Sequence, residues 1–486
     1  MKKNSFYITT TLPYVNADLH MGHALEFVRA DAIARYKMLT GHDVFFNTGT
    51  DEHGMKIYEK AKENNMEVQD FVDQNFLKFK KSLAAFGMHE DLHFIRTTDE
   101  DHIKGAQEFW KRCDKNGFIY KKNYETKYCV GCESEKSDSE LVNGFCPDHG
   151  GTPLLIIEEE NYFFKYSSFT EILKSFYAEN SNFVIPDFRY NEIKAFVERG
   201  LQDFSISRLK SKMPWGIPVP GDDEQVMYVW FDALTNYIST LGWPKVGDGT
   251  DFENYWVNGN PTQYCGKDNT RFQAAMWQAM LIAAGVPNSS QIVVNGFITA
   301  GEGIKMSKTL GNVVDPKSIV AEYGTDALRY FLLREVSSFE DSPFTLERFK
   351  EAYNANLANG LGNLVSRIMK MAVSYDVEYD FFNEESMYVK FQALYGKDMD
   401  GFNIKNVMDG IWENVSMLDQ KIATEKPFSF FKEDPIRAKI TVATLVVFLD
   451  EIAFSLKAFM PETSEKIRTL IREKKMPEVP LFLRKD

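Results

Sequence analysis

The fold class follows from residues 5–46, SFYITTTLPYVNADLHMGHALEFVRADAIARYKMLTGHDVFF. This stretch predicts a buried strand over residues 5–10, a helix over about 23–39 that ends at Gly41, and a second strand over 44–46. Strand, helix and strand at this spacing form a right-handed parallel unit, whose ligands lie at the carboxyl ends of the strands. We therefore predict an α/β protein whose chemistry lies in the loops after these two strands.

The length, composition and charge of the chain are those of an ordinary globular protein. The 486 residues exceed the usual size of a single core, so we expect two to four structural units. The 56 basic and 70 acidic residues give a net charge of −14, which argues against indiscriminate binding to nucleic acid. The first residues contain no apolar core of secretory length, and charges interrupt the apolar residues 440–460. We therefore expect a cytoplasmic protein without a membrane segment.

The rest of the chain predicts an interrupted sheet and an appended helical region. A turn-rich stretch with cysteines interrupts the alternation of predicted strands and helices, and further strands are predicted after it. Helical periodicity dominates the C-terminal third. We predict a split Rossmann-like parallel sheet with an inserted connective domain, followed by an all-α bundle. The predicted parts are a first catalytic half (1–117), the connective insertion (118–221), a second catalytic half (222–300), a segment around a lysine loop (301–346) and the helical domain (347–486).

The motif His20-Met21-Gly22-His23 lies where the first strand gives way to the first helix. The amides and dipole of a helix start attract an anion, and two imidazoles there can donate hydrogen bonds to phosphate oxygens. Gly22 leaves room for a flat ligand ring against the backbone. Taken alone, the motif is equally consistent with two polar histidines that begin a helix.

A second motif, Lys305-Met306-Ser307-Lys308-Thr309, lies among Gly301, Gly303 and Gly311, which suit a mobile loop. Two lysines three residues apart can neutralise a pyrophosphate leaving group as its negative charge develops. A solvated lysine pair is the alternative for this motif alone. Its occurrence together with the histidine motif on a split parallel sheet favours nucleotide chemistry.

With both motifs in this order, the sequence resembles the class I aminoacyl-tRNA synthetases, whose signatures are HIGH near the start and KMSKS after the second half of the sheet. Thr309 stands where that family usually has serine. The resemblance implies that Mg²⁺ accompanies ATP and that 301–346 includes a stem-contact region. It implies catalytic roles for His20, His23, Lys305 and Lys308, and ATP binding by these four together with Gly22, Gly266 and Asp268.

Four candidate metal ligands form two pairs, Cys129-Val130-Gly131-Cys132 and Cys146-Pro147-Asp148-His149. This spacing predicts tetrahedral zinc, and four protein ligands leave no open position for catalysis. We therefore predict one structural Zn²⁺ held by Cys129, Cys132, Cys146 and His149, with unrelated reduced cysteines as the alternative. The cluster resembles the zinc knuckle in the connective insertion of methionyl-tRNA synthetases.

An amino-acid pocket for methionine needs an apolar, polarizable slot and a carboxylate for the ammonium group. Residues 12–16 and 228–233 resemble the pocket-forming segments of the methionine enzymes, and Asp51 would then bind the substrate's amino group. The resemblance implies a pocket of Leu12, Tyr14, Asp51, Trp230, Ala233, Tyr237 and Gln273, organised with the help of Arg208. For each aromatic residue taken singly, core packing is the alternative.

Three positions depart from the family's pattern around this pocket. Leu234 stands where many relatives have proline, Asn269 where many have isoleucine, and Gln273 where many have histidine. A glutamine amide still forms hydrogen bonds, so these departures bear on the detailed shape of the pocket.

Candidate anticodon-binding residues lie in the helical region. Asn363 and Arg367 are four residues apart and share a helix face, as two groups that read base edges need. Residues 363–367 resemble the family's anticodon-reading helix, although a solvated face is the alternative. Phe428 follows Pro427 where family members usually have tryptophan, and its ring still offers a stacking face.

Taken as a whole, the resemblance implies a monomeric methionine–tRNA ligase. It would join L-methionine to tRNA(Met) through methionyl adenylate, for initiation and elongation of translation, with AMP and pyrophosphate as the other products. Within the class, the rivals are enzymes for leucine, isoleucine, valine or cysteine, which have a longer editing insertion or zinc in the active site. Outside it, the rivals are a non-catalytic RNA-binding scaffold and a small-molecule nucleotidyltransferase.

Overall fold

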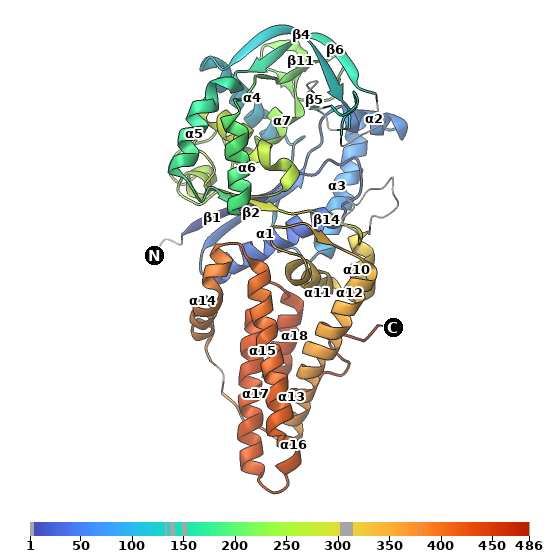
Figure 1. Ribbon diagram of the computed structural model, residues 1–486, viewed down its shortest axis with the longest axis vertical. Helices are drawn as coiled ribbons and strands as arrows, with labels where there is room; N and C mark the ends of the chain where they lie inside the picture. Colours follow the sequence, from blue (N-terminus) through green and yellow to red (C-terminus); the bar gives the residue numbers. More distant parts are fainter. Residues whose placement is uncertain are drawn as a thin grey trace. The chain divides into compact units, whose positions relative to one another are not determined.

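The computed structural model describes residues 4–131, 134–136, 141–147, 153–301, 314–380 and 382–485 (Figure 1). The chain forms two compact units. The first, here called the sheet unit, comprises Met1–Leu19, Asp43–Lys81 and Asp91–Val294. The second, called the helical unit, comprises His20–His42, Ser82–Glu90 and Asn295–Asp486. A search of the described residues finds no helix with the length and apolar character needed to cross a membrane.

A six-stranded sheet in the order β3-β2-β1-β12-β13-β7 forms the centre of the sheet unit. The pairs β1–β2, β2–β3, β1–β12 and β13–β7 are parallel. This confirms the predicted α/β class with a parallel sheet. The strands are β1 (Ser5–Thr10), β2 (Asp43–Thr50), β3 (His93–Arg96), β7 (Val184–Ile185), β12 (Thr262–Gly266) and β13 (Gln291–Asn295).

The strand order reverses between β1 and β12, because the chain first builds outward from β1 to β3 and later outward from β12 to β13. These two central strands pair in register, with Ile8 opposite Thr262 and Thr10 opposite Tyr264. Their carboxyl ends therefore lie side by side. An edge of this kind is where open α/β sheets bind ligands. We call it the switch edge.

Helices of the sheet unit bury aromatic side chains. In α4 (Glu100–Lys115), residues His102, Ala106, Phe109 and Cys113 are buried at helical spacing. The Phe109 ring stacks on Trp277 of α9 (Trp277–Ala284), with 5.4 Å between ring centroids. The other helices are α2 (Met55–Glu63), α3 (Val68–Ala85), α5 (Thr170–Glu179), α6 (Asp187–Glu198), α7 (Val229–Ala233) and α8 (Asn236–Ser239).

The segment predicted as an insertion contains a long antiparallel ribbon of β4 (Ile119–Cys129) and β6 (Leu155–Phe164), which Figure 1 shows as two adjacent curved strands. It extends into a sheet of order β5-β4-β6-β8 and is followed by a smaller sheet, β10-β11-β9. The segment also supplies β7 at the edge of the main sheet, where two residues are too few to show a strand periodicity. The other strands of these two sheets are β5 (Ser134–Lys136), β8 (Phe204–Ser205), β9 (Ser207–Leu209), β10 (Pro218–Val219) and β11 (Asp222–Met227).

A bundle of long helices dominates the helical unit, and this confirms the predicted helical C-terminal region. Figure 1 shows α13, α15, α17 and α18 running lengthwise beside one another, in agreement with their mutual contacts. Buried residues of α15 recur every three or four positions, from Ile404 and Val407 to Ile422. The helices are α12 (Leu346–Ala352), η9 (Tyr353–Gly362), α13 (Asn363–Ser374), α14 (Glu384–Asp400), α15 (Ile404–Glu425), α16 (Pro427–Phe430), α17 (Pro435–Ser455) and α18 (Pro461–Arg472).

Two buried arginines anchor α1 (Met21–Leu39) within the helical unit. Arg29 donates to Asn295 Oδ1 and to the carbonyl of Ser338, each at 2.8 Å. Arg329 of α11 (Thr325–Tyr330) donates to Asp31 Oδ2 at 2.7 Å, and both side chains of this pair are completely buried. Removing one member of such a pair leaves a buried charge, so α1 is fixed in position.

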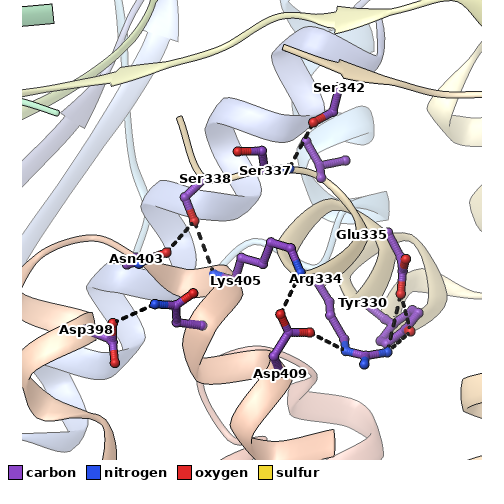
Figure 2. Close-up of polar contacts among 12 residues, drawn as sticks. Tyr330, Arg334, Glu335, Ser337, Ser338, Ser342, Asp398, Asn403, Lys405 and Asp409 are labelled. Atoms are coloured by element: carbon purple, nitrogen blue, oxygen red, sulfur yellow. Dashed lines mark hydrogen bonds and ion pairs between the residues drawn. The ribbon is translucent and has the colours of Figure 1, made fainter. Parts of the chain in front are cut away.

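Polar contacts also join the start of α15 to the segment 330–342 (Figure 2). Ser338 Oγ donates to Asn403 Oδ1 and accepts from the backbone amide of Lys405, each at 3.2 Å. Arg334 donates to Asp409 Oδ1 at 3.0 Å. These contacts orient the longest bundle helix at its first two turns.

Candidate active site

His20 and His23 form a reciprocal cap at the start of α1. His20 Nδ1 accepts from the amide of Gly22 at 3.1 Å, and His23 Nδ1 accepts from the amide of His20 at 3.2 Å. The two rings stack with 3.8 Å between centroids. Because each Nδ1 is an acceptor, the neutral rings carry their proton on Nε2, where it can be donated to a phosphate oxygen.

Gly22 packs closely against this cap. A Cβ at position 22 would lie 3.0 Å from Cε1 of the His20 ring. A larger residue here would therefore require the imidazole to shift by a few tenths of an ångström. The helix begins at Met21, two residues before the predicted start.

The loop residues Lys305 and Lys308, together with Thr309, lie outside the residues that the structure describes. The assignment of these lysines therefore stays a prediction.

Asp51 lies at the carboxyl end of β2 in the sheet unit and is 4% exposed. Its amide donates to the carbonyl of Pro13 at 3.0 Å, its carbonyl accepts from the amide of Val15 at 3.3 Å, and Tyr14 forms a parallel bridge with it. The segment predicted to line the pocket, 12–16, is thus hydrogen-bonded through Pro13 and Val15 to the residue predicted to bind the ammonium group. Leu12 in this segment is half-buried.

Trp230 of α7 belongs to an aromatic cluster in the sheet unit. Tyr14 and Trp230 are half-buried and pack against Tyr128, Tyr228 and Val229. The Trp230 ring stacks almost parallel on Phe272, with 3.8 Å between centroids and 5° between planes. The sequence interpretation did not include Phe272, because an isolated phenylalanine carries no signal of its contact.

Arg208 holds one member of this cluster. Its guanidinium lies over the Tyr228 ring at 4.7 Å and donates to Ser205 Oγ at 2.6 Å and to the carbonyl of Ser207 at 2.7 Å. Arg208 is 4% exposed, so this cation is fixed by hydrogen bonds and an aromatic face. It orients the strand end that leads into Trp230.

Tyr237 and Gln273 are buried and bonded to each other. Gln273 Nε2 donates to the Tyr237 hydroxyl, and Gln273 Oε1 accepts from Gln263 Nε2 at 2.5 Å. The backbone carbonyl of Tyr237 accepts from the Tyr7 hydroxyl at 2.9 Å. The amide at position 273 therefore does form a hydrogen bond with a predicted pocket residue.

Three further predicted residues lie near strand and helix ends of the sheet unit. Gly266 is the last residue of β12 at the switch edge, and Asp268 is an exposed residue of the short 3-10 helix η4 (Lys267–Asn269) that follows. Ala233 ends α7, is buried, and its carbonyl accepts from Asn236 Nδ2 at 2.7 Å.

A buried polar network that the sequence interpretation missed connects several of these segments. Both oxygens of Asp232 accept hydrogen bonds from histidines, His53 Nδ1 at 2.7 Å and His102 Nε2 at 2.8 Å. Glu52, next to His53, accepts two 2.8 Å bonds from Arg96. Each histidine and carboxylate was visible in the sequence, but the two histidine–Asp232 pairs span 130 and 179 positions.

Two of the four predicted metal ligands, Cys129 and Cys146, are described, and both thiols are buried. Cys146 follows a tight turn in which Val142 and Phe145 exchange backbone hydrogen bonds of 2.9 and 3.1 Å. Cys132 and His149 lie outside the described residues. Within the described part of the chain, no group of three or more histidine, cysteine or acidic side chains forms a metal site. Two buried thiols and a turn that presents one of them fit the donor chemistry of zinc.

The candidate anticodon residues lie in the helical unit. Asn363 begins α13 and is exposed, and Arg367, one turn further on, forms an ion pair with Asp419 of α15. Phe428 in α16 is 56% exposed, next to the buried Pro427. The sequence interpretation did not include Asp419, because its partner lies on another helix.

A parallel sheet with a switch edge occurs in many nucleotide-binding families, so the fold alone does not single one of them out. The family model described as tRNA synthetases class I (M) matches residues 6–153 and 148–369.

More specific matches come from whole-chain relatives. A methionine–tRNA ligase of Caldanaerobacter subterraneus subsp. tengcongensis is 39% identical over 479 residues, 96% of this chain and 73% of that relative. One of Brucella suis biovar 1 is 37% identical over 484 residues, 97% of this chain and 92% of that relative. The structure of Mycobacterium tuberculosis methionyl-tRNA synthetase in complex with methionyl-adenylate superposes with a TM-score of 0.89 at 34% identity, covering 96% of this chain and 94% of that one. The chain belongs to the methionine–tRNA ligase family.

Proposed function

We propose that this chain joins L-methionine to tRNA(Met) in two steps. The methionine carboxylate attacks the α-phosphorus of ATP, a carboxyl–phosphorus bond forms, and pyrophosphate leaves. The terminal ribose hydroxyl of the tRNA then attacks the acyl carbon, and AMP leaves. The observation that carries the proposal is the buried Asp51 at the end of β2, whose backbone amide and carbonyl are hydrogen-bonded to the segment of Tyr14.

The methionine side of the site is assigned to the sheet unit. Asp51 binds the substrate's ammonium group, because a buried carboxylate has a strong preference for a positively charged partner. Tyr14 and Trp230 supply flat, polarizable faces for the thioether, and Tyr237 with Gln273 closes the slot. Leu12 and Ala233 complete the apolar lining.

The nucleotide side is assigned to the two motifs and to the residues after β12. His20 and His23 donate from Nε2 to phosphate oxygens, which their reciprocal cap at Nδ1 supports. Lys305 and Lys308 stabilise the charge that develops on the leaving pyrophosphate. Gly266 and Asp268 contact the nucleoside, and Mg²⁺ neutralises phosphate charge when ATP is bound.

A structural Zn²⁺ is proposed at Cys129, Cys132, Cys146 and His149. Metal analysis of the purified protein should find one zinc per chain, and Cys146→Ala should lower that content to near zero. The matched control is Cys113→Ala, a buried cysteine of α4 that is not a predicted ligand. A wild-type protein that retains no zinc after purification in metal-replete buffer would contradict the assignment.

The tRNA side is assigned to the helical unit, where Asn363, Arg367 and Phe428 contact the anticodon. The proposed domain division is the one predicted above, at 117, 221, 300 and 346. We propose that the enzyme is a cytoplasmic monomer. Light scattering of the purified chain tests this, because its mass is 55.9 kDa and a dimer would double it.

Methionine-dependent exchange of labelled pyrophosphate into ATP tests the central proposal, with a panel of other amino acids and a Lys308→Ala variant. Exchange with methionine alone, greatly reduced in the variant, is the expected result. Exchange with no amino acid would favour the RNA-binding scaffold, and exchange with another amino acid would assign the pocket differently. Loading of tRNA(Met) in the same preparation tests the second step.

A further inference from the structure

The Asp232 carboxylate is completely buried and bound by two histidines from different elements. His53 follows β2, and His102 lies in the first turn of α4. The far nitrogen of the second ring, His102 Nδ1, lies 2.8 Å from Ser239 Oγ of α8. Two segments of the sheet unit thus contact the carboxylate of α7 directly, and α8 is joined to it through His102.

The charge of this group is set by its partners. Burial by itself raises the pKa of Asp232, but His53 and His102 outweigh burial and hold the pKa below its usual value. The carboxylate is therefore ionised at neutral pH, and each of its oxygens accepts from a ring N–H. Because His102 Nε2 carries the donated proton, its Nδ1 in the neutral ring accepts from the Ser239 hydroxyl.

A buried ionised carboxylate is a poor device for stability alone, since apolar residues of similar volume usually serve as well. Its directional hydrogen bonds, however, fix relative positions closely. Asp232 lies between Trp230 and Ala233 in α7, and His53 lies two residues after Asp51. The 2.7 Å bond from His53 to Asp232 therefore joins the loop of the ammonium-binding residue to the wall of the thioether slot.

Neighbouring groups fix the His53 side of this bond. The Trp215 ring lies against His53 with 5.7 Å between centroids, and Trp215 Nε1 donates to the carbonyl of Glu52 at 2.6 Å. The Glu52 side chain binds Arg96 and Thr98. The loop 51–53 is thus held in place through the side chains of Glu52 and His53.

We infer that Asp232, His53 and His102 are positioning residues for methionine, which hold Asp51 and the Trp230 wall in the relative placement that the amino acid requires. The inference rests on the proposed role of Asp51. A positioning role predicts that disrupting the bond raises KM for methionine and leaves KM for ATP nearly unchanged. A merely structural role predicts loss of folded protein, or equal effects on both substrates.

Pyrophosphate exchange with separate titrations of methionine and ATP tests the inference in three variants. Asp232→Asn keeps the shape of the side chain but replaces one carboxylate oxygen, an acceptor, with an amide N–H donor. His53→Leu removes the ring N–H that donates to Asp232. Each should raise KM for methionine about 10- to 100-fold and change KM for ATP less than about threefold. His53→Asn restores an N–H at the position of Nδ1 and should recover methionine KM to within about threefold of wild type.

His93→Leu is the matched control, because this exposed histidine of β3 packs on Phe45 in the same sheet. It should leave both KM values within about twofold of wild type. Thermal unfolding of every variant measures how much folded protein is present. If His53→Leu does not fold, the comparison of Asp232→Asn with His53→Asn still decides the question.

The inference is overturned if folded Asp232→Asn has the wild-type KM for methionine, or if both KM values rise together. Failure of the proposed function is distinguishable from this result. A wild-type enzyme without methionine-dependent exchange, or an Asp51→Asn variant with full exchange, overturns the proposed role of Asp51 and the inference with it. Normal dependence on Asp51 with wild-type behaviour of Asp232→Asn overturns the inference alone.

Discussion

The residues proposed for methionine and those proposed for the anticodon differ sharply in how the protein holds them. Asp51 is 4% exposed and forms a backbone bridge with Tyr14. Two residues further on, the buried His53 side chain is hydrogen-bonded to Asp232. Phe428, in contrast, is 56% exposed, and Asn363 lies on the surface of the bundle.

This difference reflects what each site must recognise. A small ligand presents few atoms, so each protein group must be placed within a fraction of an ångström and supported by its own hydrogen bonds. A nucleic acid loop presents bases that stack on exposed rings and tolerates adjustment during binding. Under the proposed assignments, burial in the sheet unit suits recognition of a small ligand, and exposure in the helical unit suits recognition of a nucleic acid loop.

The largest expected effect is at the buried carboxylate. Asp51→Asn leaves the substrate's ammonium group without a charged partner, and methionine-dependent exchange should fall about 100- to 1000-fold. Asp101→Asn, an exposed residue of α4, is the control and should retain full exchange. If exchange in Asp51→Asn fell by less than about threefold, the buried carboxylate would not be essential for methionine, and the contrast between the methionine and anticodon residues would not hold.

The next effect concerns the exposed ring of the helical unit. Phe428→Ala removes a stacking face and should weaken tRNA(Met) binding about 5- to 150-fold, while pyrophosphate exchange stays unchanged. Filter binding of labelled tRNA measures the affinity. Phe382→Ala, another exposed aromatic of this unit, should bind tRNA like wild type. Equal weakening in both variants would indicate general damage to the bundle.

A smaller effect is expected from the ion pair of Arg367. Asp419→Asn releases the guanidinium from its partner on α15 and should tighten tRNA binding about two- to fivefold. The gain is small because both side chains are substantially exposed to solvent. Glu413→Gln on the same helix is the control. Weaker tRNA binding in Asp419→Asn would mean that the pair orients Arg367 for binding instead of competing with the tRNA.

The smallest effect is a pH-dependent stability difference in the helical unit. Arg468 and Lys457 lower the pKa of Glu384 from 4.5 to about 2. A carboxyl whose pKa is lowered by folding stabilises the protein above its unfolded pKa, and this contribution is lost as the pH falls from about 4.5 toward 2.

Glu384→Gln should therefore lower the free energy of unfolding by about 1 kcal/mol or less at neutral pH, since the side chain is largely exposed. The difference from wild type should shrink as the pH falls through this range. Denaturant unfolding at a series of pH values measures it. A difference that stays constant with pH would assign the effect to packing.

Much of the fold and some of the site could be predicted from local patterns. The succession of strand, helix and strand over residues 5–46 predicted the parallel sheet, and helical periodicity predicted the bundle. The sequence predicted that His20 and His23 lie at the start of a helix, and the structure adds that their side chains cap it. Such features depend on residues a few positions apart, because within one helix or strand the sequence separation fixes which side chains lie on the same face.

The sequence by itself determined the fold class, the motif order and the chemical types of the site residues. Only the tertiary structure decided that His53 and His102 share the Asp232 carboxylate, that Gln273 binds Tyr237, and that Asp419 holds Arg367. These partners lie 36 to 179 positions apart along the chain. No local pattern signals them, because which side chains meet depends on how whole elements pack around the core and not on the spacing of neighbours.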